Sequence, residues 1–579
     1  MTHRFSAGLA IAGVLLLCTS PRAAQQRPPL APADVTSIAE LLKIEDTRQF
    51  DEPTLTRLLA SSHPEVRRRA VVTVGRVPNL RGPAILEPIK ADKDPEIVAT
   101  VTFALGQLKD PAGVPWLTQT MNGWAANAAA AFEAARSLGK IRSPEARTAL
   151  NTFVTAAPNE PGARRVIGEA LLSLGRFTDP GDLAPLLKWT TSTDVELRWR
   201  ATWALFRPRN PAAVPHLLTL SKDASPEVRF WAVRGLVPQL IDQLASPTLT
   251  RDIASARLRE AVKDADRRVR TEALRVLTAY DDDASVAAVL AELDNPDTWM
   301  SVPAAETLGR HKTRIAEIAP RLAAASAPTR PLALRLAAVT PLTQLAPPLA
   351  LETLGSLLGH PSVYARTVAT QALRNMGPLG QQRLDAAAKD PTLKDLLIAP
   401  PTPGGARGGA AGRGGAAATP PDRPLEDYRR LVEQWIVPAY NGAANPRAVW
   451  TTPKGEIEIE LFAADAPLGM EELVRLTESG AITGPVFSRL VPNFVAQQAT
   501  IPGANRLRDE VNQHGLLRAN LAWASSGLDT GRPGYTLGNT PQPHNEGDFT
   551  SLGRVVRGMD VVDRLELGDA ITAARVILR

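Results

Sequence analysis

The sequence predicts two structural classes in one chain: an all-α superhelical solenoid of helical repeats, followed by a mainly-β closed barrel with two helices. Three observations predict this order. A helical unit recurs about every 31 residues through the first two thirds of the chain. A stretch rich in glycine, alanine and proline then interrupts the helical pattern, and beyond it apolar residues alternate with polar ones. With 579 residues the chain is too long for a single core, so separate domains are expected.

The overall charge argues against a nucleic-acid partner. The chain has 66 Lys plus Arg and 60 Asp plus Glu, a net charge of +6 spread along its whole length. A nucleic-acid binder should concentrate its basic residues on one face. The densest basic run, Arg67–Arg69, lies on a repeat helix, where such a run is expected to be a solvated flank.

The first 24 residues have the pattern of a secretory signal. Arg4 precedes the apolar run Leu9–Leu17, and small residues follow at Ser20–Ala24. The apolar run is too short to remain as a membrane anchor. We therefore predict a signal peptide over residues 1–24, cleaved after Ala24, and an exported protein that is periplasmic or secreted.

The single cysteine bears on the same prediction. Cys18 lies inside the predicted signal, and lipidation there is the less favoured alternative because Leu17 is larger than lipoprotein sites usually accept. Without residues 1–24 the mature chain has no cysteine, which excludes disulfides and thiol catalysis. No later stretch is apolar for the ~20 residues that a membrane helix needs, so no transmembrane segment is expected in the mature chain.

The repeat region is predicted over residues 35–398. Each copy has a short polar or proline turn followed by an amphipathic helix with small residues. The clearest copies begin at Pro64, Pro95, Val195, Pro226 and Arg267. Proline suits the first helical position, where its missing N–H would have no partner. One helix pair cannot bury its own apolar stripe, but stacked neighbours can, which gives a solenoid.

This pattern resembles HEAT-like repeats. The resemblance implies a long concave surface that a protein partner could occupy. Trp199, Trp203 and Trp231 form an aromatic stripe that we expect to be inter-repeat core rather than a ligand site. The histidines are scattered, without the spacing of metal ligands, so the sequence gives no support for a metal site or another cofactor.

Two connecting segments are expected between the repeats and the barrel. Residues 399–424 have no apolar periodicity, and we predict a flexible tether. Residues 425–446 follow, with a connecting helix over Glu426–Tyr440 whose apolar face should pack on the domain that follows.

The final domain, residues 447–579, is predicted to be the barrel. Apolar and glutamate residues alternate from Glu456 to Phe462, as in a half-buried strand. A helix should begin at Ala466–Pro467 and end at Gly480, and further short strands are expected around Phe487 and Phe494. Many short antiparallel strands with two helices indicate a barrel capped at its ends.

Several stretches of this domain resemble the cyclophilin peptidyl-prolyl isomerases. Residues 484–498, GPVFSRLVPNFVAQQ, match that family's F-x-R-x-x-P-x-F-x-x-Q signature. SSGLDTG at 525–531 and PQPHNEGDFTSLGRVVRGMDVVDRL near the end match two further family segments. The resemblance covers about residues 447–579.

The resemblance assigns roles to particular residues. Arg489 matches the arginine that donates a hydrogen bond toward the prolyl nitrogen while the peptide bond is twisted. Gln497 matches a residue that binds the peptide and orients this arginine, although an exposed strand glutamine is a rival interpretation. The other substrate-binding positions implied are Phe487 (an aromatic behind the arginine), Phe494, Val495 and Leu552 (around the proline ring), and Ser525 (backbone pairing with the peptide).

The sequence departs from the family on the opposite side of the expected groove. Gly534 replaces a peptide-binding glutamine, and Thr536 replaces a phenylalanine of the proline pocket. Losing an apolar ring could forfeit ~1–3 kcal/mol of contact. His544 stands where some members have another aromatic residue, and it has no role as a general base because the reaction transfers no proton.

The sequence therefore predicts an exported peptidyl-prolyl cis-trans isomerase of weak activity, without a cofactor, acting on proline-containing peptides or unfolded client proteins held by the solenoid. The alternative is a non-catalytic interaction scaffold whose barrel only binds peptides. DNA binding by the repeats is disfavoured by the export signal and the dispersed charge.

Overall fold

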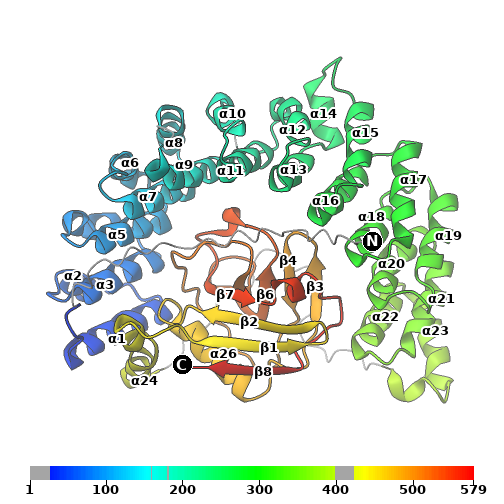
Figure 1. The fold of residues 1–579 in the computed structure, drawn as a ribbon. Coiled ribbons are helices and arrows are strands. Elements are labelled where there is room, and N and C mark those ends of the chain that lie inside the picture. Colours follow the sequence, from blue (N-terminus) through cyan, green and yellow to red (C-terminus); the bar gives the residue numbers. More distant parts are fainter. Residues whose placement is uncertain (1–26, 158–159, 179–180, 398–422, 579) are drawn as a thin grey trace, which may run out of the picture.

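The helices form an open arc, and the β-domain lies inside it (Figure 1). The structure is a computed structural model that describes residues 27–157, 160–178, 181–397 and 423–578. The predicted signal peptide over 1–24 and almost all of the predicted tether over 399–424 lie outside these residues. The N-terminal region is helical and the C-terminal region is a curled antiparallel sheet, as the sequence predicts.

The arc consists of paired helices that follow one another along the chain. In its first half these are α1 (Pro32–Thr47), α2 (Glu52–Leu59), α3 (Pro64–Arg76), α4 (Gly82–Ile85), α5 (Pro95–Leu108), α6 (Val114–Asn122), α7 (Ala128–Ile141), α8 (Pro144–Ala156), α9 (Pro161–Leu174), α10 (Ala184–Thr190), α11 (Val195–Phe206) and α12 (Val214–Leu220). The second half contains α13 (Pro226–Val233), α14 (Pro238–Leu244), α15 (Arg251–Ala261), α16 (Arg267–Leu277), α17 (Asp283–Ala291), α18 (Thr298–Leu308), α19 (Ile315–Ala325), α20 (Leu332–Leu345), α21 (Pro347–Leu358), α22 (Val363–Asn375) and α23 (Pro378–Lys389).

A repeated ion pair joins neighbouring units of the arc. The fourth helical residue of a copy is arginine, and its side chain reaches an aspartate in the turn before the next inner helix. Arg67 pairs with Asp92 at 2.8 Å, and Arg229 pairs with Asp264 at 2.8 Å. The same arginines donate to carbonyl oxygens of their own turn, as Arg67 does to Ser61. Each pair fixes the angle between adjacent repeats as well as the turn beneath it.

The tryptophan stripe is core, as predicted. Trp199, Trp203 and Trp231 are 1–4% exposed. Trp231 stacks on Trp199 with ring centroids 6.3 Å apart, and it meets Trp203 edge-on at 6.5 Å. These rings fill the contact between α11 and α13, so they are not available to a ligand.

The connecting helix packs on the start of the solenoid. It comprises α24 (Leu425–Leu431), a π-helical turn over Val432–Ile436, and α25 (Val437–Tyr440). The buried Tyr428 hydroxyl donates to Asp46 of α1 at 2.9 Å. The sequence predicted that this helix packs on the following domain, and it lies near the barrel helix α26 (Pro467–Glu478) as well as beside α1 (Figure 1).

The β-domain is one curled antiparallel sheet. Its strands are β1 (Arg447–Thr452), β2 (Gly455–Leu461), β3 (Phe487–Val491), β4 (Val495–Gln498), β5 (Asn520–Ala524), β6 (Arg532–Gly538), β7 (Ser551–Arg557) and β8 (Ala573–Ile577). They are ordered β3-β4-β6-β5-β7-β2-β1-β8. The sheet curls so that β3 meets the segment before β8, where Phe487 N–H donates to the Asp569 carbonyl at 2.7 Å. Helix α26 and the short α27 (Met559–Val562) complete the domain.

The alternation that predicted β2 holds in the fold. Ile457, Ile459 and Leu461 are fully buried, while the glutamates between them face outward. The barrel interior also holds a stack of aromatic rings. Trp523 stacks on Tyr535 at 4.6 Å, and Trp450 tilts against Tyr535 at 5.4 Å. These buried rings fill the interior of the curled sheet.

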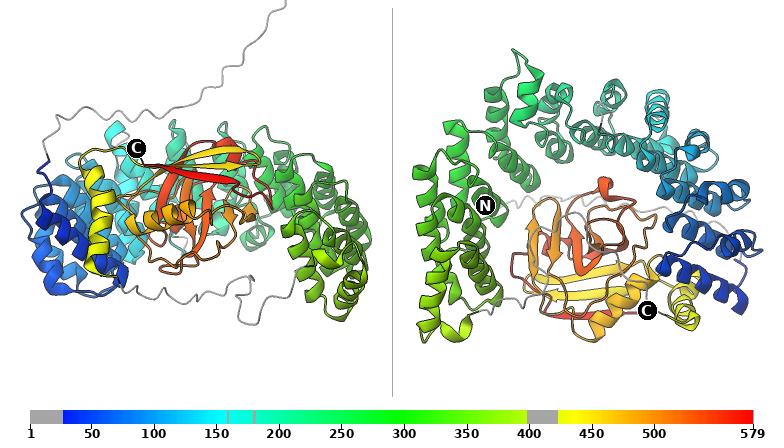
Figure 2. Two further views of the ribbon diagram at one scale, coloured as in Figure 1. Left: turned by 90° about the horizontal axis from the view of Figure 1, so that it is seen from below. Right: turned by 180° about the vertical axis from the view of Figure 1, so that it is seen from behind.

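The inner side of the arc faces the chain's own β-domain. Both views of Figure 2 show the sheet between the first repeats and the last ones. The concave surface expected for a separate partner is therefore largely taken by the C-terminal domain. The basic run Arg67–Arg69 is not the solvated flank that was predicted, because Arg69 is 7% exposed and donates to the Ala464 carbonyl of the β-domain at 2.6 Å.

Candidate functional site

The candidate site is built on the hairpin of β3 and β4. Val491 pairs with Val495, and Arg489 pairs with Gln497 across the two strands. The turn between the strands is tight because Asn493 adopts a left-handed conformation (φ 59°), which asparagine tolerates better than most residues. The motif thus forms the hairpin expected from the sequence, with Phe494 at its end.

Arg489 lies at the centre of the exposed face of this hairpin. Its guanidinium donates to Gln497 Oε1 at 3.2 Å and lies 5.5 Å from the centre of the Phe494 ring. The Arg489 side chain is exposed, although burial of one side lowers its pKa below the usual value for arginine. An arginine stays charged at neutral pH in either environment. The site therefore presents a cation that is oriented by an amide and an aromatic ring and remains open to solvent.

Of the other predicted residues, two lie in the core and one borders a cleft. Phe487 is fully buried behind Arg489, as the family resemblance implies. Val495 is 5% exposed and borders a small cleft toward Trp299 of α18. Leu552 is 1% exposed and packs against Gly469 of α26, so it is part of the core beneath that helix.

Ser525 lies in a loop of its own. Its hydroxyl donates to the Gly527 carbonyl at 2.5 Å, so the side chain is engaged within the loop 525–531. Asp529 of that loop forms a nearly buried ion pair with Arg48 of the first repeat at 2.6 Å. The solenoid therefore fixes the loop whose backbone the resemblance assigns to the peptide.

The opposite wall differs from the family for a steric reason. A Cβ added at Gly534 would lie 2.8 Å from the Gln498 carbonyl oxygen and 3.0 Å from that of Ala499. The chain after β4 thus occupies the space that a glutamine side chain would need. Thr536 pairs with Gln497 across β4 and β6, and its hydroxyl donates to the Ala522 carbonyl at 3.2 Å. A short polar side chain stands beside the groove where the family has an aromatic ring.

The solenoid holds the β3–β4 hairpin from the far side. Asn493 is 1% exposed, and its amide donates to the Arg268 carbonyl at 3.0 Å and to Glu272 Oε1 at 3.1 Å, both in α16. The Tyr364 hydroxyl of α22 donates to the Ser488 carbonyl at 3.2 Å. These contacts fix the residues on both sides of Arg489 in the sequence. Sequence reasoning placed Asn493 only in a turn, since nothing local indicates a partner in another domain.

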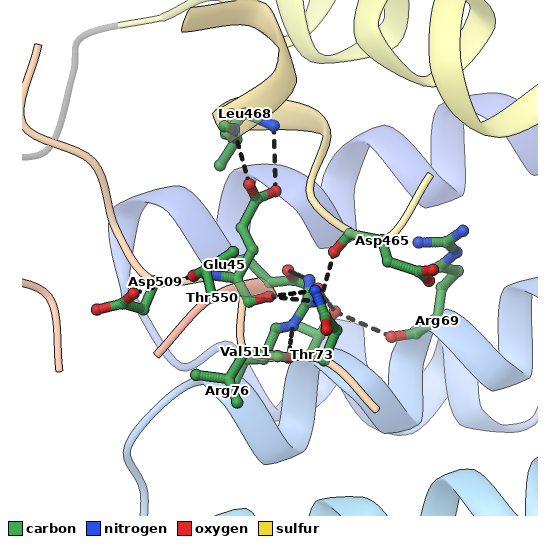
Figure 3. Close-up of polar contacts among 12 residues, drawn as sticks. Glu45, Arg69, Thr73, Arg76, Asp465, Leu468, Asp509, Val511 and Thr550 are labelled. Carbon is green, nitrogen blue, oxygen red and sulfur yellow. Dashed lines mark hydrogen bonds and ion pairs between the residues drawn. The ribbon is translucent and has the colours of Figure 1, made fainter. Parts of the chain in front are cut away.

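A second set of contacts joins the first repeats to the base of the β-domain (Figure 3). The Arg76 guanidinium donates to the carbonyls of Val511 at 2.8 Å and Asp465 at 2.7 Å, and it pairs with Glu45 at 2.7 Å. The Glu510 carboxylate accepts hydrogen bonds from the first N–H groups of α26, including Gly469 at 2.8 Å. Burial raises the pKa of Glu510 to about 8 despite these donors and Arg76.

A further aromatic residue adjoins the site. His544 stacks on Phe494 with ring centroids 6.4 Å apart and an interplanar angle of 19°. Burial, followed by the positive charges of Arg207 and Arg176, lowers the pKa of His544 to about 3, so the ring is neutral. It extends the apolar floor that Phe494 begins.

Within residues 27–157, 160–178, 181–397 and 423–578, no group of three or more His, Cys, Asp or Glu side chains is arranged to hold a metal ion. In the same part of the chain, no helix is both long and apolar enough to cross a membrane.

Comparison with known proteins identifies both parts. Residues 448–577 match the family described as cyclophilin type peptidyl-prolyl cis-trans isomerase, and residues 82–172, 161–237 and 183–254 match HEAT repeats. A peptidyl-prolyl cis-trans isomerase of Helicobacter pylori is 31% identical over 158 residues, which cover 26% of this chain and 93% of that protein. One from Synechococcus elongatus is 29% identical over 139 residues, covering 23% of this chain and 96% of the relative.

The chain therefore belongs to the cyclophilin-type peptidyl-prolyl cis-trans isomerases and carries HEAT repeats in its N-terminal region. These matches support peptidyl-prolyl cis-trans isomerase activity in the C-terminal domain.

Proposed function

We propose that the protein is an exported isomerase in which Arg489 lowers the barrier to rotation of X–Pro bonds in proline-containing peptides or unfolded clients. The single observation that carries this proposal is the geometry of Arg489, exposed, hydrogen-bonded to Gln497 and lying over Phe494. A proline ring placed against Phe494 would bring its peptide nitrogen within reach of the guanidinium.

The chemistry follows from the electronic structure of the amide. Partial double-bond character of the C–N bond sets the rotation barrier at ~18–20 kcal/mol. In the twisted state the prolyl nitrogen regains a lone pair, which a guanidinium N–H can bind. A donor that is already oriented stabilises this state without reorganising, and its charge is less screened beside the Phe494 ring than in water. No covalent step and no cofactor are needed.

The experiment compares the wild type with Arg489→Ala in a protease-free assay of a proline tetrapeptide, such as NMR exchange between the cis and trans forms. Removing one oriented donor to the transition state typically costs about 10²–10³-fold in rate, and we expect a loss of kcat/KM in that range. Arg554→Ala is the matched control, because Arg554 is an exposed arginine of β7 in the same domain, paired with Glu460. The control should keep the wild-type rate.

A non-catalytic peptide-binding module is the second candidate, favoured by the occupied space at Gly534 and by Thr536. Background rates for both wild type and Arg489→Ala, together with binding of the peptide to the wild type, would support this alternative and overturn the catalytic proposal.

Export is a separate part of the proposal and rests on the sequence of residues 1–24. Expression of the full-length gene followed by mass spectrometry of the purified protein tests it. The expected product begins at Gln25 and is found outside the cytoplasm. An intact N-terminus in the cytoplasmic fraction would contradict export, and a lipid-modified Cys18 would show that anchoring replaces release.

A further inference from the structure

A basic cavity lies between the two domains, next to the aromatic pair of the candidate site, since the His544 ring that stacks on Phe494 is part of its wall. This basic cavity has a volume of about 310 Å³, and its cationic residues come from the ends of successive repeat helices. They are Lys109, Lys140, Arg142, Arg176, Arg207 and Arg209. His544 lines the same cavity, and Asp548 is the single carboxylate in its lining.

Half of these cations already have partners. Lys109 pairs with Asp548 at 2.8 Å, and the buried Lys140 lies 3.4 Å from Glu133. Arg176 donates to the Glu546 carbonyl at 2.5 Å. The contacts of Lys109 and Arg176 hold the loop 544–548, which contains the His544 ring beside Phe494.

The other three cations have no ion pair within the described residues. Arg142, Arg207 and Arg209 are exposed, and none of the ion pairs (N···O within 4.0 Å) among the described residues involves them. The pKa of Arg207 is lowered by burial and then by Arg234 and Arg209, which means that its neighbours are repulsive. An anion in the basic cavity would therefore gain attraction without first displacing an internal partner.

The distance to the catalytic groove fits a short peptide. The Arg489 guanidinium lies 5.5 Å from the Phe494 ring, and that ring lies 6.4 Å from His544 at the cavity wall. An extended chain spans roughly 3.3–3.6 Å per residue, so His544 is within about four residues of a proline held at Arg489. A side chain three to five residues from the proline can thus reach the basic cavity while the X–Pro bond lies in the groove.

We infer that the basic cavity is a specificity site of the isomerase, which binds the carboxylate of an aspartate or glutamate three to five residues from the substrate proline. The inference rests on the proposed function, since it takes the groove at Arg489 as the place of the proline. It gives the repeats a direct part in substrate recognition, because the three unpaired arginines all belong to the solenoid. Proline peptides with acidic residues at that spacing are the preferred class of substrate.

The test uses pairs of fluorescent peptides that differ by one Glu or Gln placed two to six residues from the proline, on either side. With the full-length protein, we expect kcat/KM to be about five- to tenfold higher for Glu than for Gln at one side and spacing only, since exposed ion pairs contribute modestly. The ratio of kcat/KM between the Glu and Gln peptides should decrease as the salt concentration rises. The triple variant R142A/R207A/R209A should lose the ratio while keeping the wild-type rate on the Gln peptide.

Two further measurements keep the outcome unambiguous. The charge-conserving variant R142K/R207K/R209K should retain most of the preference, and thermal unfolding should show that both triple variants fold, because the three side chains are exposed. Fluorescence anisotropy gives Kd for the same peptides without requiring turnover. If no peptide is isomerised, catalysis fails but the Glu preference in Kd still tests the basic cavity. Equal values for Glu and Gln at every position, or a preference that survives the alanine variant, would overturn the inference.

Discussion

The two ends of the solenoid contact the β-domain through different kinds of interaction. The first repeats use buried or nearly buried charge: Arg76 with Glu45 and three backbone carbonyls, and Arg48 with Asp529. The later repeats use hydrogen bonds from neutral donors at the β3–β4 hairpin: the buried Asn493 amide donates to Arg268 and Glu272 of α16, and the Tyr364 hydroxyl donates to the Ser488 carbonyl. The first set holds the base of the domain, and the second touches the turn beside the candidate site.

This difference separates anchoring from positioning. A buried ion that loses its partner is strongly destabilising, because the remaining charge has been removed from water. A neutral hydrogen bond contributes less to stability, but a small displacement of a catalytic donor reduces the rate. Changes in the first repeats should therefore alter stability, and changes beside the hairpin should alter catalysis.

The largest expected effect comes from Arg76→Ala. The change leaves Glu45 buried without its cation and frees carbonyls of Val511 and Asp465, so docking of the β-domain should weaken by about 3–5 kcal/mol. Hydrogen exchange measured by mass spectrometry should show faster exchange in residues 464–470 and 509–511. The rate of isomerisation per folded molecule should change little. A loss of kcat/KM with unchanged hydrogen exchange would contradict the separation of anchoring from positioning.

A change of pH should weaken the same anchor by a smaller amount. Burial raises the pKa of Glu510 to about 8, so between its ordinary pKa and pH 8 the native protein binds a proton that the unfolded chain has released. Stability then falls as pH rises, because the native state holds more protons. We expect a loss of about 1.6 kcal/mol between pH 6.5 and 8, since a fully protonated native group contributes about 1.4 kcal/mol per pH unit and Glu510 is half deprotonated by pH 8.

The pH window is chosen to separate Glu510 from other shifted groups. The pKa of His544 is lowered to about 3 and that of Lys140 to about 8, so their opposite contributions fall mainly below pH 6.5 and above pH 8. Melting temperatures of the wild type and Glu510→Gln at the two pH values provide the measurement. Glu510→Gln should lose most of the dependence of stability on pH. An equal dependence in both proteins would show that other groups cause it.

Much of the candidate site could be predicted from the sequence, but the contacts between the solenoid and the β-domain could not. Arg489, Phe494 and Gln497 lie within nine residues, where strand alternation and a turn determine which side chains share a face. Leu552 was assigned to the proline ring by resemblance, but it packs under α26 because its strand presents it to the core. Arg76 ends a repeat helix like any surface arginine, and its carbonyl partners lie 389 to 435 residues away. No local period encodes such a contact, and the space filled at Gly534 depends equally on the path of the chain after β4.

The smallest expected effect on stability, with a distinct effect on rate, comes from Asn493→Gly. Glycine keeps the left-handed turn at φ 59° but removes the amide that donates to Arg268 and Glu272. The turn remains attached to its own domain, because the Thr540 hydroxyl still donates to the Asn493 carbonyl at 2.9 Å. We therefore expect the free energy of unfolding to fall by about 1 kcal/mol. The value of kcat/KM should fall about fivefold to tenfold because Arg489 loses its fixed position.

The matched control for this change is Asn445→Ala, which removes a similar amide contact, to Glu460 at 3.0 Å, far from the hairpin in the sheet order. It should leave kcat/KM near the wild-type value. In the double variant with Arg76→Ala, each change should keep its own effect: Asn493→Gly lowers the rate and Arg76→Ala weakens docking. Little coupling is expected because the two sites share no partner. A loss of docking in Asn493→Gly as large as that in Arg76→Ala would instead show that the solenoid holds the β-domain as one unit and that anchoring and positioning cannot be separated.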